Sequence, residues 1–268
     1  MSLIESIKMV VTDLDGTLLD KYGQLSTQNL DAIKWLKANG IRFVIATGRP
    51  YFSVPPLLSL WKLEGYVDAI IANNGLEIAV TNGPMFYGER MKKEWVHEIL
   101  ETYNSCPGDF CLYHNDVLVG ETMSDFMQMV SKKNRIKAQV VDLRDYVQSD
   151  IEKLLLACDP KDMVEVEQFH ALQNEHRFRG FRSQSYLFEF MHPSVNKMNG
   201  ILRYCEFMTI DPKQVVAFGD NLNDLEMIQG SGMGVVMENG DPLVKVHAHL
   251  IAPHHDEDGF AQVIKTWM

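Results

Sequence analysis

The sequence predicts an α/β fold in which a parallel sheet lies between layers of helices and a second domain is inserted into the first. Short apolar runs without polar alternation recur near both ends of the chain, which is typical of strands buried on both faces. Stretches with helical periodicity separate these runs. The middle of the chain instead carries shorter, half-polar strand candidates, which indicates a different kind of sheet.

The composition fits an ordinary globular protein. The chain has 268 residues, enough for one large domain or two modest ones, and its net charge of −11 argues against nucleic-acid or anionic-membrane partners. No apolar run approaches the ~18 residues of a membrane span, and no signal-peptide pattern begins the chain. Cys106, Cys111, Cys158 and Cys205 lack metal or redox spacing, so we expect free thiols in a reducing cytoplasm.

The first predicted strand, residues 8–11, runs into a loop that carries Asp13 and Asp15. If the strand geometry persists, both carboxylates point the same way. Gly16 then permits a sharp turn, and Thr17 adds a hydroxyl and an amide. Two carboxylates this close repel each other unless a cation lies between them or one carries a proton, so this loop indicates chemistry.

Two other interpretations of this loop compete with a catalytic one. A calcium loop with the Asp-x-Asp pattern has its glycine at the sixth position and a glutamate at the twelfth, between two helices. Here Gly16 is fourth from Asp13 and a strand precedes the loop. A plain Asp-rich turn is the remaining alternative for this fragment taken alone.

The next elements predict a βαβ unit with a right-handed crossover. A helix follows a cap at residues 25–29 and ends at Asn39-Gly40, and a second buried strand at 41–46 leads into Thr47 and Gly48. A third strand at 69–72 ends in Asn73-Asn74-Gly75. These strands are apolar throughout, which favours a parallel sheet covered on both faces.

From about residue 83 to 189 the pattern changes. Helices are predicted at 92–103, 124–135 and 163–175, and strands at 110–114, 117–121, 139–143, 153–158, 178–184 and 186–191. Because these strands are short and half-polar, we expect an antiparallel sheet covered by helices on one side.

The parallel pattern resumes at about residue 192. A helix is predicted at 199–207 and a bare apolar strand at 215–218, which ends in Gly219-Asp220-Asn221-Leu222-Asn223-Asp224. A helix at 225–228 and strands at 233–237 and 249–252 follow.

Polar residues therefore follow three predicted strands: Asp13 and Asp15, then Thr47, then Asp220, Asn223 and Asp224. In open parallel sheets, ligands bind at the carboxyl ends of the strands where the strand order reverses. Lys197 lies just before a predicted helix, where it is either a solvated charge or a point cation for phosphate. Its place between the insert and Gly219-Asp220 favours the phosphate interpretation.

Four motifs occur in this order along the chain: Asp13-x-Asp15-Gly16-Thr17, Thr47-Gly48-Arg49, Lys197 and Gly219-Asp220-x-x-Asn223-Asp224. They resemble the four motifs of the haloacid dehalogenase superfamily of phosphohydrolases. The insert resembles that of the Cof-like branch of sugar-phosphate phosphatases, and the similarity covers the whole chain. Leu76 and residues 232–237 depart from the usual pattern without touching the chemistry. The resemblance implies a Rossmann-like three-layer core at 1–82 and 190–268, and an inserted α/β (α+β) cap domain at 83–189.

The resemblance also implies the roles of single residues. Asp13 is implied as the nucleophile and Asp15 as the general acid and base. Mg²⁺ is implied as the cofactor, held by Asp13, the carbonyl of Asp15, Asp220 and, directly or through water, Asp224. The implied phosphate-binding set consists of Leu14, Gly16, Thr17, Thr47, Gly48, Lys197 and Asn223.

The implied activity is Mg²⁺-dependent hydrolysis of small phosphorylated metabolites, sugar phosphates or similar, through an aspartyl-phosphate. A phosphomutase and a non-catalytic phosphate-binding regulatory protein are the alternatives; Asp15 argues against the latter, which needs no general acid. We expect a cytoplasmic monomer or small homo-oligomer whose partner is a small metabolite, with no nucleic acid and no membrane.

Three arginines of the insert, Arg177, Arg179 and Arg182, stand out in an acidic chain. They either form a solvated strand edge or supply a contact to a polar or anionic part of the substrate. On a strand, Arg177 and Arg179 would share one face and Arg182 the other.

The histidines His247, His249, His254 and His255 match no metal spacing and are expected on a solvated surface. Residues 230–234 predict a turn rather than a dinucleotide-binding loop.

Overall fold

The computed structural model describes residues 6–134 and 136–268. The chain forms two compact units: Met1–Gly88 with Asn196–Met268, and Glu89–Val195. These boundaries lie later than the predicted 82/83 and 189/190. Strand β5 (Met85–Tyr87) pairs within the sheet of the first unit, and β11 (Leu187–Met191) continues past residue 189 within the sheet of the second.

The described part of the first unit contains an eight-stranded sheet with the strand order β14-β13-β12-β1-β2-β3-β4-β5. Its further strands are β1 (Met9–Thr12), β2 (Arg42–Ala46), β3 (Ala69–Ala72), β4 (Glu77–Val80), β12 (Val215–Gly219), β13 (Met233–Met237) and β14 (Leu250–Ala252). Pairing is parallel from β14 to β3, while β4 and β5 add antiparallel edge strands that the sequence pattern did not predict.

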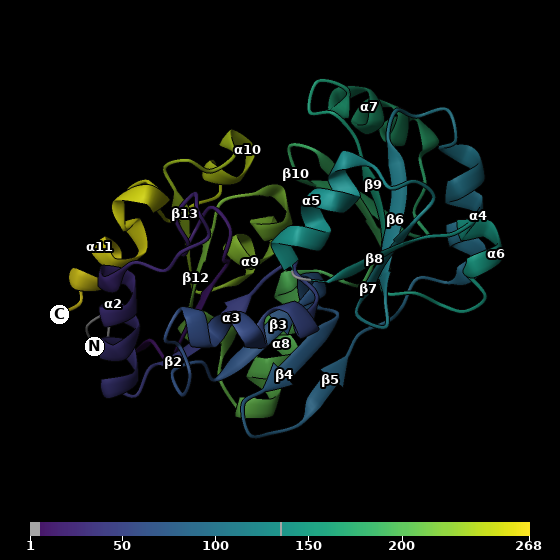
Figure 1. Cartoon of the computed structure of the whole chain (residues 1–268). Coiled ribbons are helices and arrows are strands. Elements are labelled where there is room, and N and C mark those ends of the chain that lie inside the picture. The colour runs from purple at the N-terminus through teal and green to yellow at the C-terminus, as the bar shows by residue number, and fades with distance from the viewer. Residues whose placement is uncertain (1–5, 135) are drawn as a thin grey trace. The chain divides into compact units, whose positions relative to one another are not determined.

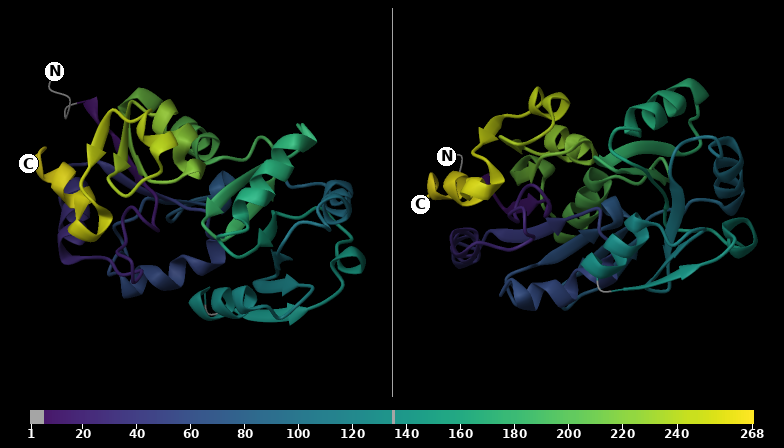
Figure 2. Two further views of the ribbon diagram at one scale, coloured as in Figure 1. Left: turned by 90° about the horizontal axis from the view of Figure 1, so that it is seen from above. Right: turned by 45° about the horizontal axis from the view of Figure 1, so that its top comes forward.

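Helices cover both faces of this sheet, which gives the predicted Rossmann-like three-layer core. On one face, α2 (Thr27–Ala38) and α11 (Gly259–Lys265) pack side by side (Figure 1). The two views of Figure 2 also show yellow α11 beside the purple segment that carries α2. On the other face, α8 (Lys197–Met208) and α9 (Leu225–Gly230) contact each other and bury Ile201, Tyr204 and Met227 against the strands.

The remaining helices in the described residues of the first unit are short. They are α3 (Pro55–Leu60), α10 (Pro242–Lys245) and the 3₁₀ turns η1 (Tyr51–Ser53), η2 (Asn73–Gly75), η3 (Pro212–Gln214), η4 (Leu222–Asp224) and η5 (His255–Glu257). Turn η2 follows strand β3 directly and η4 begins three residues after the end of β12, so both turns lie at the carboxyl ends of these strands.

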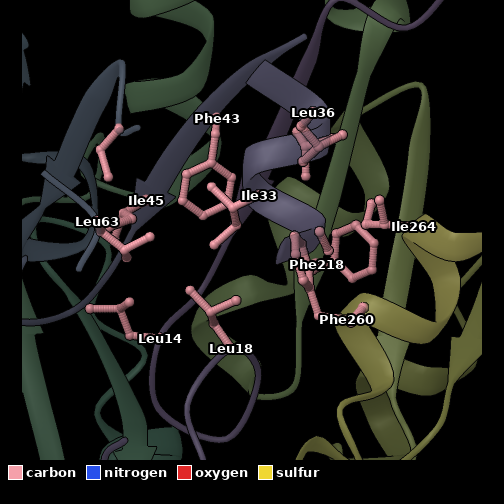
Figure 3. Close-up of a cluster of buried hydrophobic side chains, with 14 of the residues drawn as sticks. Leu14, Leu18, Ile33, Leu36, Phe43, Ile45, Leu63, Phe218, Phe260 and Ile264 are labelled. Atoms are coloured by element: carbon pink, nitrogen blue, oxygen red, sulfur yellow. The ribbon is translucent and has the colours of Figure 1, made fainter. Parts of the chain in front are cut away.

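A dense apolar cluster fixes the face of the sheet that α2 and α11 cover (Figure 3). Phe43, Phe218 and Phe260 meet edge to face, with ring centroids 6.2 Å and 4.8 Å apart for the Phe43–Phe260 and Phe218–Phe260 pairs. Leu14 and Leu18, from the loop after β1, are buried in the same cluster. The loop that carries the paired aspartates is therefore anchored by apolar side chains as well as by the strand.

The described residues of the second unit contain a six-stranded sheet with the order β10-β11-β9-β6-β7-β8. Its strands are β6 (Asp109–His114), β7 (Val117–Gly120), β8 (Lys137–Val140), β9 (Leu154–Ala157), β10 (Arg179–Gln184) and β11. Most pairs are antiparallel, as expected, but β7 and β8 run parallel. The predicted strand at 139–143 ends early, because the carboxylate of Asp142 caps the short helix α6 (Leu143–Tyr146) through the N–H groups of Arg144 and Asp145.

The expectation that helices cover one side of this second sheet is wrong. Helices α4 (Lys93–Thr102) and α7 (Met163–Gln173) lie over one face and bury Phe188 and Phe190 (Figure 1). Helix α5 (Asp125–Asn134) packs on the opposite face, against Cys111 and Leu155. The strand residues that contact α4 and α7 alternate with those that contact α5, since neighbouring strand residues point to opposite faces.

Two features expected from the composition concern membrane spans and cysteines. Within residues 6–134 and 136–268, no helix has the length and apolarity to span a membrane. The cysteines, all of which lie in these ranges, are free thiols, with Cys111 and Cys205 buried.

Candidate active site

Strand β1 delivers Asp13 to the carboxyl edge of the first sheet. The backbone N–H of Asp13 donates to the carbonyl of Phe218 on β12 at 2.9 Å, so the pairing of the two strands extends to this residue. The loop then turns at Gly16, whose φ is +86°. A Cβ at Gly16 would lie 2.6 Å from Oδ2 of Asp220, so any larger residue would collide with that carboxylate.

Lys197 connects Asp13, which follows β1, with Asp224, which lies in the turn after β12. It is the first residue of α8 and is fully buried, and its Nζ donates to Oδ1 of Asp13 at 2.7 Å and to Oδ1 of Asp224 at 2.5 Å. The side chain of Asn196 caps the helix by accepting from the N–H of Asn199 at 2.8 Å. A lysine buried at this position is compensated by two carboxylates, which rules out the solvated-charge interpretation.

Two further contacts hold the aspartates that follow β12. The hydroxyl of Thr17 donates to Oδ1 of Asp220 at 2.7 Å. Oδ2 of Asp224 accepts from the backbone N–H groups of Asp220 at 2.8 Å and Asn221 at 3.0 Å. Asp224 therefore fixes the turn that presents Asp220, and both of its oxygens are engaged.

The electrostatics of this cluster are dominated by burial. Burial raises the pKa of Asp13 to about 7, against the opposing influence of Lys197 and with help from the negative charge of Asp224. Burial, with repulsion from Asp224 and Asp13, also raises the pKa of Asp220 well above its usual value. Burial lowers the pKa of Lys197, but the two carboxylates raise it by more, so this lysine stays charged.

The raised pKa of Asp13 predicts how stability depends on pH without metal. This pKa is about 7 in the folded protein against an ordinary value of 3.8, so folding binds the proton more tightly. Its stabilising contribution is full below about pH 4 and is lost as pH rises through 7. The Asp13→Asn variant has no such contribution to lose. In EDTA, the Tm of this variant minus the Tm of the wild type should therefore be larger at pH 8 than at pH 5. A difference in Tm that stays constant between these pH values would contradict the prediction.

Asp15 has a different neighbour. Arg49, in the loop after β2, donates from Nε to Oδ2 of Asp15 at 2.7 Å and from Nη2 to Oδ1 at 2.6 Å. The pair is partly exposed, with 12% of the Arg49 side chain and 27% of the Asp15 side chain accessible. In the sequence, Arg49 belongs to a recognised motif, but its type and position alone assign it no role.

Asn74 connects three of the predicted phosphate-binding residues. Its Oδ1 accepts from Nδ2 of Asn223 at 3.0 Å, and its backbone N–H donates to the carbonyl of Thr47 at 3.0 Å. A Cβ at Gly48 would lie 3.2 Å from the same Oδ1, so Gly48 permits this close approach. Thr47, Gly48 and Asn223 are thus gathered around one asparagine, through its backbone and its side chain, that the sequence pattern did not assign to the site.

The turn η2 also supports Lys197. Gly75 has a φ of +99°, and a Cβ there would lie 2.2 Å from the carbonyl oxygen of Asn196. The turn therefore packs against Asn196, the residue that caps α8 immediately before Lys197. Asn74 has a φ of +54°, a left-handed conformation that asparagine tolerates better than most residues. The signal in the sequence was the Asn73-Asn74-Gly75 pattern after an apolar strand.

Three carboxylates form a possible metal site. Oxygens of Asp13, Asp220 and Asp224 all lie within 4.8 Å of one another among the described residues. These carboxylates face one lysine, and hard oxygen donors of this kind suit Mg²⁺. The residues therefore fit a divalent cation. The side chain of Asp15 is outside this group, which leaves its backbone carbonyl as the predicted contribution.

The second possible metal-binding group is His254, His255 and Asp256, where the sequence predicts a solvated surface. Its contacts fasten a loop: Nδ1 of His255 lies 2.7 Å from the carbonyl of Leu19, and Asp256 accepts from the N–H of Lys21. Asp256 is exposed, whereas the two histidines are partly buried.

The arginines of the second unit are arranged differently from the prediction. Arg177 precedes β10 and pairs with Glu175 and Glu98. Arg179 donates to the carbonyl of Val195 at 3.1 Å and lies over the ring of Phe181, whereas Nε of Arg182 lies 3.4 Å from Glu167 on α7. Arg179 and Arg182 do lie on opposite faces of the strand, but Arg177 is not part of it.

Comparison with known proteins places this geometry in a family. The family model of haloacid dehalogenase-like hydrolases matches residues 10–264. A haloacid dehalogenase-like hydrolase from Bacteroides thetaiotaomicron has a similar structure, with a TM-score of 0.83, 28% identity and coverage of 98% of this chain and 100% of that one.

Two curated relatives from Bacillus subtilis are similar along nearly their whole length. The 5-amino-6-(5-phospho-D-ribitylamino)uracil phosphatase YitU is 27% identical, with 97% of each chain covered. The phosphatase YwpJ is 25% identical over 97% of this chain and 99% of its own.

Proposed function

The chain belongs to the haloacid dehalogenase-like hydrolases, and from that premise we propose that it is a Mg²⁺-dependent phosphatase that hydrolyses small phosphorylated metabolites through an aspartyl-phosphate. That it is a hydrolase of the phosphatase class agrees with its relatives. The observation that carries the finer proposal is the cluster of buried Asp13, Lys197 and Asp224 with partly buried Asp220, and Asp15 two residues from Asp13.

In the proposed first step, a carboxylate oxygen of Asp13 forms a bond to phosphorus. The bond between phosphorus and the leaving alkoxide breaks, and Asp15 gives its proton to that oxygen. In the second step, the oxygen of a water molecule forms a bond to phosphorus while the bond to Asp13 breaks. Asp15, now a carboxylate, takes the proton of that water.

The other residues bind and orient the phosphoryl group. Lys197 holds Asp13 by one bond and offers a positive charge to the phosphoryl oxygens. Thr47, Gly48 and Asn223, gathered around Asn74, are proposed to contact the same oxygens, together with the loop of Leu14, Gly16 and Thr17. Mg²⁺, held by Asp13, the carbonyl of Asp15 and Asp220, would screen the repulsion between two anions. Asp224 supports this set by orienting Asp220.

Selection among substrates is proposed to reside in the second unit, Glu89–Val195. The residues proposed to bind phosphate and metal all belong to the first unit. They contact the phosphoryl group, which every phosphomonoester shares. A sugar phosphate or a similar metabolite is the proposed substrate class. The named substrate of the Bacillus subtilis relative, a phosphorylated ribityl compound, is consistent with this class.

The proposal is tested by release of inorganic phosphate from p-nitrophenyl phosphate and a panel of sugar phosphates. EDTA should stop release and added Mg²⁺ should restore it, whereas Ca²⁺ should not, because its larger and looser coordination misplaces the nucleophile. Full activity in EDTA would contradict the metal requirement. Phosphate bound to the protein without release would favour a regulatory protein, and transfer to a second hydroxyl would favour a phosphomutase.

A further inference from the structure

We propose that Arg49 is a positioning residue for the reaction: it holds the carboxylate of Asp15 in the orientation from which the proton reaches the leaving-group oxygen. The inference rests on the proposed function and adds to it a residue outside the predicted site. It is carried by the paired hydrogen bonds between Arg49 and Asp15 and by the contacts that fix the backbone of Arg49.

The side chain of Arg49 donates to both oxygens of Asp15. The two N–H···O bonds, of 2.7 Å and 2.6 Å, run from two nitrogens of one guanidinium to the two oxygens, and such a pair fixes the direction of the carboxylate. Asp13 is buried among charged neighbours, whereas the side chain of Asp15 is 27% accessible. A short, accessible carboxylate samples several rotamers unless a partner restrains it, and Arg49 supplies that restraint.

Arg49 can serve as an anchor because its own backbone is fixed. Its N–H donates to the hydroxyl of Thr47 at 3.2 Å, and its carbonyl accepts from the N–H of Asn73 at 2.9 Å. Pro50 follows, which restricts the backbone of Arg49 to extended conformations. The N–H of Tyr51 then donates to Glu77 at 3.0 Å, so the loop after β2 is fastened on both sides of Arg49.

The geometry is compatible with proton transfer. When Asp15 carries its proton, the protonated oxygen no longer accepts from the guanidinium, and the bond at that oxygen opens. The other N–H···O bond can remain and keep the carboxyl group directed. After the transfer both oxygens accept again, which restores the paired arrangement for the second step.

Substrates with different leaving groups distinguish the positioning of Asp15 by Arg49 from direct binding of the phosphoryl group by Arg49. An alkoxide leaves poorly without a proton, whereas p-nitrophenolate leaves without one. If Arg49 acts through Asp15, its loss should therefore matter much more for an alkyl phosphate than for p-nitrophenyl phosphate. If Arg49 binds the phosphoryl group, both substrates should suffer equally, because both carry that group.

The experiment compares Arg49→Met and Arg49→Lys, each measured as kcat/KM on p-nitrophenyl phosphate and on the sugar phosphate that the wild type hydrolyses fastest. We expect Arg49→Met to lose ~10²-fold or more on the sugar phosphate and less than ~10-fold on p-nitrophenyl phosphate. Arg49→Lys keeps the charge but not the paired bonds, so it should recover little. The matched control is Arg42→Met, at the opposite end of β2, where the arginine lies 3.5 Å from Asp68.

A double-mutant cycle completes the test. In an Asp15→Asn background, Arg49→Met should change kcat/KM on the sugar phosphate by less than ~3-fold, because a residue that acts through Asp15 has nothing left to position. Equal losses of Arg49→Met on both substrates, or additive losses in the double variant, would overturn the proposal while leaving phosphatase activity in place. A wild type that releases phosphate from no phosphomonoester would instead overturn the proposed function and this inference with it.

Discussion

Asp13→Asn should lower kcat by more than ~10³-fold while the protein remains folded, since an amide cannot form the covalent bond to phosphorus. The substitution keeps the size of the side chain and removes one negative charge from a cluster in which Asp220 and Asp224 repel it. The far-ultraviolet circular dichroism should therefore be that of the wild type.

Steady-state phosphate release with saturating Mg²⁺ measures this effect. Asp31→Asn is a suitable control, because Asp31 lies on the outer face of α2 with 63% of its side chain accessible and pairs only with Lys34 in the described contacts. The control should keep wild-type turnover. A variant at position 13 that retains a tenth of the wild-type kcat would remove Asp13 from the role of nucleophile.

Lys197→Met should cost both activity and stability. The side chain is fully buried and its Nζ bridges Asp13 and Asp224, so methionine leaves two buried carboxylates without their common cation. Breaking a buried ion pair from one side costs about 3–5 kcal/mol in the free energy of unfolding. Loss of one charged contact to the phosphoryl group should lower kcat/KM by at least ~10²-fold.

Urea denaturation and phosphate-release kinetics measure the two effects on the same preparation. Lys213→Met is the matched control, since Lys213 is exposed in the turn before β12. Its unfolding free energy should stay within about 0.5 kcal/mol of the wild type. If Lys197→Met unfolded at the same urea concentration as this control, the lysine would not be compensating the carboxylates.

Much of the site could be predicted from the sequence because its residues follow strands. Asp13, Thr47 and Asp220 each come directly after an apolar run, and parallel strands bring their carboxyl ends to one edge. The apolar runs were recognisable because strands buried on both faces carry no polar alternation. The three-layer core is confirmed, and strand β3 has the predicted bounds.

Edge elements were harder to predict. Strands β4 and β5 lie at the rim of the sheet and are only partly buried, and their apolar stretches, Ile78–Val80 and Met85–Tyr87, are only three residues long. Helix α5 covers the second face of the second sheet, which half-polar strands did not indicate. Local pattern reports how much of each face is buried but not which helix buries it.

The sequence by itself determined which residues could do chemistry: the spacing of Asp13 and Asp15, the position of Lys197 before a helix, and the turn that carries Asp220 and Asp224. Only the tertiary structure decided which of them touch. Arg49 lies 34 residues from Asp15, and Asn74 lies 149 residues from Asn223, yet both pairs are within hydrogen-bond distance. Such contacts depend on the order of strands in the sheet and on the left-handed turn after β3, and these arise from long-range packing that no local pattern encodes.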